Sequence, residues 1–544
     1  MNQLVRELNR PRTYLFLGNI LLSLVLIFLS NIGILPIREQ GDFLFLTFIF
    51  ILFALYRPGW AFLFYVGTIM MENINLAPDV LVISIRPYQF FGALILASLV
   101  IRFAAKRLNF VLLRLKWHDY LIILTTVASF ISCLASPDKV LSLKLSIIYT
   151  SFVALYILSR NYVRDSEDLS KIMPFILGSS VISVLYGIWQ NVRYIGGRSA
   201  FEIMPGRPNA TFPEADWLGM YLVIITAAIY AIIFYYEKNN DDAGSSEISD
   251  IKLSIINKIK KLGLHKIGSC IMLIGCFILM ILTVSRSAWL GALAVTIASL
   301  FMILTDLKIN PKSWQWKKFF RTSITIIISG IISVGIVYFF NLTSFQLFNR
   351  FQSTGTGMQK ITIACRKNAN LPEQVDTSEE LIRYGCRHIN LEEIPMEERQ
   401  GNLIAEIYRK DPNVKIRKEI YKHSWTEIKN NPILGIGWGS IGKKLGADER
   451  GAELNASNIF FEIWLGSGLL GLLGFLIVWI YIPIRQILNF LRSISLKSKA
   501  FVIFSFAAWV GLSVSNLFNS GIMLGFLWLF MAISLIDVSR ANSD

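Results

Sequence analysis

The sequence has 544 residues, of which 54% are apolar and only 17% are charged, and its mean hydropathy is +0.53. A soluble globular chain usually carries about 25% charged residues, so this composition excludes a soluble enzyme, a disordered chain and a disulfide-rich secreted domain. Lys and Arg exceed Asp and Glu by 53 to 37, a net charge of +16. In a membrane protein such an excess first reflects cytoplasmic loops, and no nucleic-acid partner is expected. The predicted fold class is an all-α polytopic membrane protein.

About 20 apolar residues are needed to cross a bilayer as a helix, and fourteen segments qualify as candidate spans. They are residues 14–35, 43–56, 59–77, 81–101, 119–135, 140–158, 172–191, 217–236, 267–284, 287–305, 322–341, 458–482, 500–517 and 521–536. The second and last are short, and the third ends in polar residues. The first is longer than a signal-peptide core and lacks a small-residue cleavage site, so we interpret it as an uncleaved span.

The distribution of positive charge among the loops predicts the orientation. The loops at residues 1–13, 102–118, 159–171, 237–266, 306–321 and 483–499 together hold 26 Lys and Arg, whereas the short loops on the other side hold 7. Short loops rich in Lys and Arg stay in the cytoplasm. Both termini are therefore expected to be cytoplasmic.

One loop differs from the others in kind. Residues 342–457 form a polar, extracytoplasmic segment between the eleventh and twelfth spans, with 17 Lys and Arg against 15 Asp and Glu. It is long enough to fold as a small cap. Apolar residues recur at helical spacing over 415–429, which predicts an amphipathic helix. Cys365 and Cys386 lie outside the cytoplasm in this loop, where a disulfide is chemically allowed, but sequence alone leaves their bonding open.

Some arginines lie on the outer side, against the usual bias. No acidic residue occurs near Arg286 from residue 251 to 305, nor near Arg86 from 80 to 118. Any single one could simply extend to lipid headgroups. As a set they suggest more, because the arginine fork matches phosphate geometry and keeps its charge. The outer set predicts a lipid-linked phosphate or pyrophosphate ligand: Arg86, Arg207, Arg286, Arg350 and Arg417.

Metal and cofactor motifs are not found. The sequence has no phosphate-binding loop, no His-Glu-x-x-His, no paired Cys motif and no Asp-x-Asp, so neither a metal nor a cofactor is expected. Glu214 and Asp216 are the nearest thing to an acidic pair. The stronger interpretation of Asp216 is that it caps the helix that begins at Trp217.

Two glycine-rich segments have structural alternatives. Residues 431–439, Asn-Pro-Ile-Leu-Gly-Ile-Gly-Trp-Gly, resemble a nest whose backbone N–H groups bind an anion, or they form a plain turn. The glycines at 466–474 are spaced for close helix packing, which is the interpretation we favour.

Four segments, in order and on the same predicted side, resemble the O-antigen ligase and polymerase superfamily. They are Gly206-Arg-Pro-Asn-Ala-Thr-Phe212 with Trp217-Leu-Gly-Met-Tyr-Leu222, Thr283-Val-Ser-Arg-Ser-Ala-Trp-Leu-Gly291, Arg417 to Trp425 with Asn431-Pro-Ile-Leu-Gly-Ile-Gly437, and Ala456-Ser-Asn-Ile-Phe-Phe-Glu-Ile-Trp-Leu-Gly466. The resemblance covers about residues 205–480. It predicts N-terminal helices over 1–204, a catalytic region over 205–482 that includes the loop 342–457, and C-terminal helices over 483–544.

The resemblance implies a GT-C-like, metal-independent glycosyltransferase of the bacterial plasma membrane. Its donor would be an undecaprenyl-pyrophosphate-linked glycan and its acceptor another glycan. Its other partners would be membrane lipids and other polysaccharide export proteins. Arg207, Arg286 and Arg417 would be catalytic, holding the pyrophosphate and stabilising its charge as it leaves. The expected substrate-binding residues are Arg86, Arg350, Ser457, Asn458 and Glu214.

Ser457 departs from the family pattern, in which many members place His before the Asn that matches Asn458. That His is thought to activate the acceptor, and a serine hydroxyl is a poor base. The candidate bases in this sequence are Glu462, which we expect to be catalytic, and Glu214.

These expectations favour a polymerase that extends lipid-linked repeat units of an exopolysaccharide at the outer face. The alternative is an O-antigen-type ligase that transfers a finished glycan to a lipid or protein acceptor. A lipid or glycan transporter is less favoured, because transporters usually place ionisable sites near the midplane.

Overall fold

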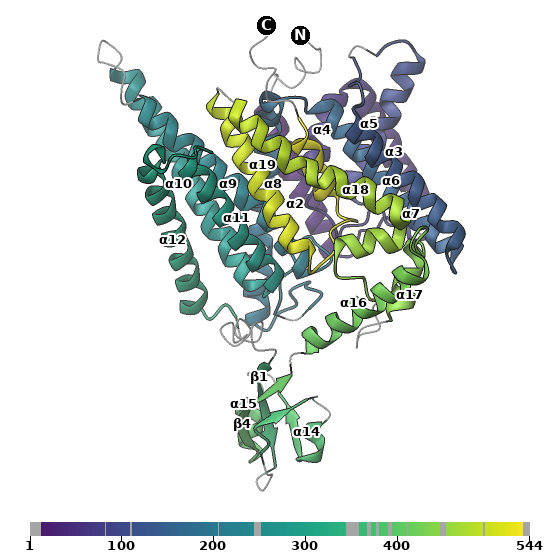
Figure 1. Cartoon of the computed structure of the whole chain (residues 1–544), viewed down its shortest axis with the longest axis vertical. Helices are drawn as coiled ribbons and strands as arrows, with labels where there is room; N and C mark the ends of the chain where they lie inside the picture. The colour runs from purple at the N-terminus through teal and green to yellow at the C-terminus, as the bar shows by residue number, and fades with distance from the viewer. Residues whose placement is uncertain are drawn as a thin grey trace.

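The computed structural model is mostly helical (Figure 1). It describes residues 12–81, 83–108, 111–204, 206–243, 252–343, 358–366, 371–376, 380–389, 394–410, 412–446, 453–492 and 495–536. Within these residues, ten helices are long and apolar enough to cross a membrane. The chain is therefore a polytopic membrane protein.

The helices before the large loop form most of the bundle. They are α2 (Arg12–Asn31), α3 (Gln40–Tyr56), α4 (Pro58–Gly67), α5 (Pro87–Ala104), α6 (Trp117–Ser132), α7 (Lys139–Tyr162), α8 (Ser166–Ile195), α9 (Ala215–Ala243), α10 (Lys252–Leu282), α11 (Arg286–Thr305) and α12 (Trp316–Phe339), with short 3-10 turns at Asp79–Leu81, Cys133–Ala135 and Pro311–Ser313. After the loop come α18 (Ile459–Arg492), α19 (Leu496–Asn516) and α20 (Gly525–Ser534).

The predicted count of fourteen spans is not confirmed. The segments expected at 43–56 and 59–77 are α3 and α4, which meet at 120° and form at most one broken span. Pro58 sits at the first position of α4, where a proline starts a helix and cannot continue the preceding one. The last predicted segment contains only the short helix α20.

Local sequence explains where several helices begin. Side chains of Asp138, Asp165, Ser285 and Ser495 accept hydrogen bonds from the first-turn N–H groups of α7, α8, α11 and α19. Such caps satisfy N–H groups that have no partner within the helix. The caps therefore fix the ends of helices whose apolar composition already favours burial.

The bundle is centred on α9, which has the largest buried share of the candidate spans. It packs against α10, α11 and α19, and α11 in turn packs closely on α19. Gly291 of α11 and Gly511 of α19 make this approach possible, since a Cβ on either would lie about 3 Å from the other's carbonyl oxygen. This tight core holds the starts of α9 and α11 at one end of the bundle.

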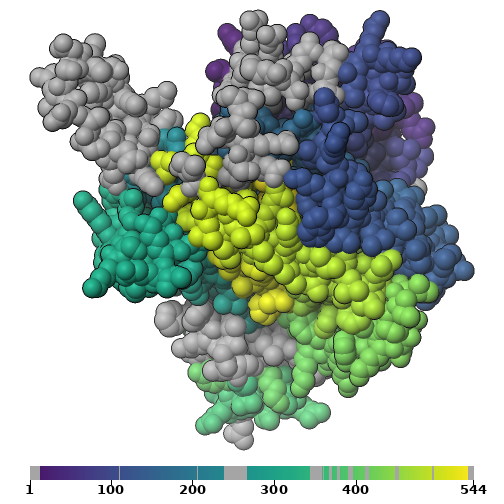
Figure 2. Space-filling model, turned by 45° about the horizontal axis from the view of Figure 1, so that its top comes forward, coloured from purple at the N-terminus to yellow at the C-terminus, as the bar shows by residue number. Residues whose placement is uncertain are grey.

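Residues 358–446, which we call the cap, lie at that same end, which we call the cap face (Figures 1 and 2). The cap contains β1 (Met358–Cys365), β2 (Gln374–Val375), α14 (Glu380–Arg383), β3 (Cys386–His388), α15 (Ile394–Arg399), β4 (Leu403–Lys410), α16 (Pro412–Asn430), a 3-10 turn at Trp438–Ser440, and α17 (Ile441–Leu445). The predicted amphipathic helix at 415–429 is confirmed as part of α16.

The all-α prediction is wrong for the cap. Its four strands form one sheet in the order β2-β4-β1-β3, with β1 antiparallel to both β4 and β3. Ile361, Ile363 and Ile407 are buried in a small core of their own. The alternation of polar and apolar residues over Lys360-Ile-Thr-Ile363 is a short strand signal, which the prediction of helices alone did not use.

A disulfide joins Cys365 to Cys386, which pair across β1 and β3. The bond closes a loop with a sequence separation of 21 residues, for which a native disulfide contributes about 3 kcal/mol. We expect Cys386→Ser to leave membrane insertion intact and to destabilise the sheet by about that amount. Limited proteolysis of membranes should cut the variant's cap faster than wild type.

The matched control for the disulfide variant is Cys270→Ser, because Cys270 is a free cysteine in α10. Its cap should resist protease as wild type does. A cap that resists cleavage equally with and without Cys386 would show that the disulfide does not stabilise the sheet.

Candidate functional site

An ion pair on the cap face connects the loop before α9 to α9 itself. Nη2 of Arg207 lies 3.3 Å from Oδ2 of Asp216, and Nε of Arg207 donates to the carbonyl oxygen of Thr283 at 2.9 Å. α9 begins at Ala215, so Asp216 lies in the first turn and is not the cap that the sequence suggested. Arg207 keeps 15% of its side-chain surface exposed, which leaves it accessible from the cap face.

The loop that carries Arg207 is held in shape from within. Gly206 donates its N–H to Oε1 of Glu202 at 2.8 Å, and its φ of 71° is one that glycine adopts without strain. Burial raises the pKa of Glu202, and the hydrogen bond from Gly206 opposes that shift. Asn209 bridges the loop by donating to the carbonyl oxygen of Phe212. Arg207 is thus presented on a defined turn.

The turn between α10 and α11 meets this ion pair. Its Val284 has a φ of 53°, and Ser285 caps α11. The carboxylate of Asp216 also hydrogen-bonds Ser285, which places the first residue of α11, Arg286, next to the Arg207–Asp216 pair. Asn519 holds the turn from the other side by donating to Oγ of Ser287 at 2.9 Å.

Helix α16 brings a third arginine to the same place. Arg417 contributes to the electrostatic field at Asp216 and lies over the Phe518 ring, 5.7 Å from its centroid. One turn later, Tyr421 donates to the carbonyl oxygen of Leu517 at 2.7 Å. Burial raises the pKa of Tyr421, against the opposing charge of Arg417, so the phenol stays protonated and acts as a donor.

The entry to α18 borders the arginines. Asn458 donates to the carbonyl oxygen of Leu517 at 3.4 Å, and the carbonyl oxygen of Ser457 accepts from Tyr421 at 3.3 Å. Ser457 has a φ of 50°. The carboxylate of Glu462 accepts the N–H of Ala456 at 2.6 Å. Glu462 therefore stabilises the turn that presents Ser457 and Asn458.

The structure places Arg86 in a different setting from the other arginines. The expectation that it lacks an acidic neighbour is wrong in three dimensions, because its Nη1 lies 2.7 Å from Oε2 of the buried Glu72. The same nitrogen donates to Oη of Tyr88 and to the carbonyl oxygen of Met523. Sequence distance hid this partner, which lies 14 positions earlier. Arg350 lies outside the residues that the structure describes.

Glu214 is exposed beside the start of α9, and its carbonyl oxygen accepts the N–H of Leu218. It is thus the exposed carboxylate of the pair that the sequence singled out, two residues from Asp216. Sequence reasoning assigned no part in the site to Asp216, Tyr421 or Asn519. The i, i+4 spacing of Arg417 and Tyr421 on a helix was the one available signal, whereas Asn519 lies in another loop altogether.

The glycine-rich turn is structural. The N–H groups of Ile436 and Gly437 both donate to the carbonyl oxygen of Leu465, so these amides are not available for an anion. Gly468 breaks α18, and Leu469 N–H donates to Ile433. The favoured helix-packing interpretation is confirmed for Gly474, where a Cβ would lie 3.0 Å from the carbonyl oxygen of Leu121 in α6. Gly466 instead packs against the ring of Trp438, outside the α-helices.

Arg207 and Arg417 thus act on Asp216 from two separate elements, and Arg286 follows directly after Ser285, the residue of the third element that hydrogen-bonds this carboxylate. Guanidinium groups in this arrangement bind phosphate oxygens bidentately. Among the residues searched, which are those that the structure describes, no group of three or more His, Cys, Asp or Glu is placed to hold a metal ion. The chemistry that these side chains can supply is electrostatic stabilisation of an anion.

Comparison with known proteins gives one finding. Residues 271–476 match the model of a family described as O-antigen ligase. Neither the curated proteins nor the solved structures include a match to the chain. The matched residues run from α10 into α18, so they contain Arg286, Arg417 and Asn458 and stop short of Arg207 on the N-terminal side.

Proposed function

We propose that the chain, which the O-antigen ligase domain at residues 271–476 places in the O-antigen ligase/polymerase superfamily, is a membrane polymerase of undecaprenyl-pyrophosphate-linked oligosaccharide repeat units. The family match supports a glycosyl-transferring enzyme that acts on lipid-linked glycans. The observation that carries the finer proposal is that Arg207 and Arg417 meet at Asp216, whose carboxylate also hydrogen-bonds Ser285, the residue before Arg286. A pyrophosphate is the anion that best uses several fixed guanidinium groups at once.

The proposed orientation puts the cap face outside the bacterial plasma membrane and both termini in the cytoplasm. The 26 Lys and Arg of the opposite loops support this orientation. The disulfide in the cap supports it too, because disulfides persist in oxidising compartments. The donor would then enter from the outer leaflet, and its pyrophosphate would lie at the level where α9 and α11 begin.

In the proposed reaction, a hydroxyl of the acceptor glycan attacks the anomeric carbon of the donor. The new C–O bond forms as the bond to pyrophosphate breaks, and the electron pair leaves with the polyprenyl pyrophosphate. The three arginines stabilise the charge that develops on that leaving group. Asp216 would hold Arg207 in place until the phosphate displaces it. Polarisation by the arginines reduces the need for strong base assistance.

The hydroxyl proton needs an acceptor in this scheme. Glu214 is exposed and lies two residues before Asp216 in the chain, so a bound sugar could reach its carboxylate, and we propose it as the base. Glu462 already accepts a backbone N–H, and we propose it as a positioning residue for Ser457 and Asn458. Those two residues would contact the acceptor. In this scheme residues 1–204 and 483–544 are supporting helices around the catalytic region 205–482. The reaction needs no metal or cofactor, and Arg350 would be a further contact to the donor.

A ligase uses the same donor and the same arginines, so the product distinguishes the two functions. Deleting the chain in its host should abolish long glycan and leave single lipid-linked repeat units, which electrophoresis of extracted lipid-linked glycans would resolve. The wild-type chain supplied on a plasmid should restore long glycan.

Two other outcomes would replace the proposal. Long lipid-linked chains that accumulate without transfer would identify a ligase. Single units that accumulate only on the cytoplasmic side, protected from an external glycosidase, would identify a transporter.

A further inference from the structure

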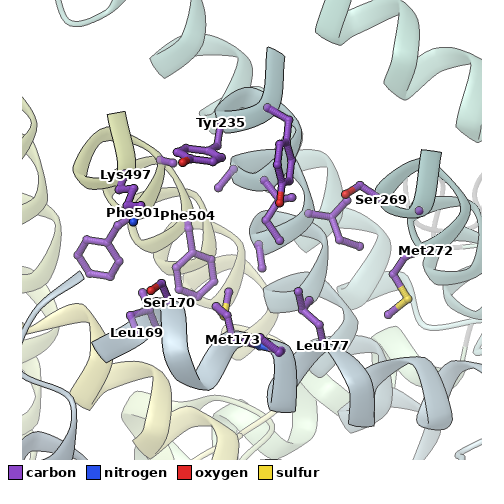
Figure 3. Close-up of a pocket in the computed structure, with 18 of the residues that line it drawn as sticks. Leu169, Ser170, Met173, Leu177, Tyr235, Ser269, Met272, Lys497, Phe501 and Phe504 are labelled. Carbon is purple, nitrogen blue, oxygen red and sulfur yellow. The ribbon is translucent and has the colours of Figure 1, made fainter. Parts of the chain in front are cut away.

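A second site lies at the end of the bundle opposite the cap. It is a cavity of about 810 Å³ lined by residues of α2, α8, α9, α10 and α19. In Figure 3, Phe501 and Phe504 of α19 lie on one side, Ser269 and Met272 of α10 lie on the other, and Leu169, Met173 and Leu177 of α8 lie along the bottom of the view. Nothing in the proposed glycosyl transfer uses this cavity.

Contacts at the cap face show where the cavity lies along the helices. The cap-face ends are the start of α9, the end of α10 and the end of α19, because Asp216, Thr283 and Ser515 all take part in contacts there. The cavity is lined by the other ends, namely residues 228–236 of α9, 268–272 of α10 and 497–504 of α19. It is therefore in the half of the bundle that faces away from the arginines.

The depth of the cavity corresponds to one leaflet. Its α8 residues follow a single helix face from Ser166 to Val181, a rise of roughly 22 Å at about 1.5 Å per residue. Half of a bilayer, headgroups included, is also about 20–22 Å thick. The polar lining groups Ser166, Ser170 and Lys497 belong to the first two turns of α8 and the first turn of α19, at the end of the cavity farthest from the cap. Ser269, Tyr235 and Tyr236 add further polar atoms to the lining, whereas α8 residues nearer the cap, such as Leu177, are apolar.

The lining determines which kind of molecule fits. An apolar cavity does not hold water, and an empty one would forfeit dispersion contacts along its walls. Hydrocarbon chains are the apolar material available at this depth. Lys497 is exposed at the rim and, among the residues that the structure describes, forms no ion pair. A lysine beside an acyl-chain cavity attracts the phosphate of an anionic lipid.

We propose that this cavity binds one anionic phospholipid from the leaflet opposite the cap, with its acyl chains between α8, α9, α10 and α19 and its headgroup at Lys497. The lipid would fill the gap between helices that the protein itself does not close. The inference does not depend on the proposed glycosyl transfer, since it uses none of the residues at the cap face.

Position 268 offers a way to fill the cavity without disturbing the fold. Gly268 lines the cavity, and a Cβ added there would have no atom within 4 Å. Gly330 of α12 has the same open surroundings and lies outside the cavity. Gly268→Trp is therefore the test variant and Gly330→Trp is its matched control.

The experiment uses the full chain in nanodiscs that contain phosphatidylglycerol with a photoreactive acyl chain. After irradiation, peptide mass spectrometry should locate adducts on residues 169–181 and 500–504. We expect Gly268→Trp to reduce these adducts severalfold, Gly330→Trp to leave them unchanged, and Lys497→Gln to lower the preference for phosphatidylglycerol over an equivalent phosphatidylethanolamine probe.

Three results would overturn the proposal. Equal labelling in wild type and Gly268→Trp would show that the cavity is not the binding site. Equal labelling by the anionic and zwitterionic probes in wild type would remove the role of Lys497. Displacement of the probe by undecaprenyl phosphate would assign the cavity to a polyprenyl chain instead.

Discussion

Replacing Arg207 with alanine should lower the rate of glycan chain extension at least about a hundredfold, the usual cost of losing one preorganised group that stabilises a developing negative charge. Arg207 is the arginine whose partners are best defined, with Asp216 at 3.3 Å and the Thr283 carbonyl at 2.9 Å. The measurement is the initial rate of extension of labelled lipid-linked repeat units in membranes, at protein levels matched by immunoblot. Arg286→Ala should have a loss of the same order.

Arg207→Lys should restore part of this rate, because lysine keeps the charge but lacks the fork that binds two oxygens. Arg193→Ala is the matched control: Arg193 also ends near this face, where it stacks on Trp189 and donates to the carbonyl oxygen of Ser199. It should extend chains at the wild-type rate. A wild-type rate for Arg207→Ala, or an equal loss in Arg193→Ala, would contradict a phosphate-binding role for Arg207.

Removing Arg86 should destabilise the fold by about 3–5 kcal/mol, the usual cost of leaving one partner of a buried ion pair alone. The carboxylate of Glu72 is fully buried and accepts from Arg86, from Tyr88 and from the N–H of Gly525, each at 2.7 Å. Gly525 is the first residue of α20, where a negative charge is favourable. Thermal unfolding of purified Arg86→Ala in detergent should show the loss.

The double variant Glu72→Gln/Arg86→Ala should recover part of that stability, because no buried charge is left without a partner. Arg102→Ala is the control, since Arg102 lies in the last turn of α5 and bonds only backbone carbonyls of residues 55 and 56 among the contacts described. If Arg86→Ala unfolds at the wild-type temperature and selectively loses donor binding, Arg86 has instead the substrate-binding role that the sequence suggested.

Local properties of the sequence were enough for much of the architecture. Apolar runs predicted most of the long helices, since a span depends on the composition of about 20 consecutive residues. The same reasoning was weakest at 43–56, 59–77 and 521–536, where the structure has a bent helix pair and a short helix. Because Pro58 and the polar residues after 67 interrupt the apolar runs, the helix ends in the first two of these segments depend on packing against neighbouring helices.

The candidate site was only partly visible in the sequence. Arg207, Arg286 and Arg417 stood out because positive charge on the outer side is unusual, and each lies in a recognisable motif. The sequence analysis considered Asp216 only as one of an acidic pair and as a helix cap, because an acidic residue at the start of a helix is ordinary. Its importance comes from an ion pair with a residue on the preceding loop and a hydrogen bond to Ser285.

The class of protein could be predicted from the sequence, because a polytopic membrane chain with a large polar loop follows from composition and from spacing along the chain. The arginine-bearing segments added a resemblance to the O-antigen ligase and polymerase superfamily. The tertiary structure alone decided which charges meet. It paired Arg86 with Glu72, brought Arg207 and Arg417 to Asp216 and used the amides of 436 and 437 to pack against α18. Contacts between distant residues depend on how helices cross, and no local pattern encodes that geometry.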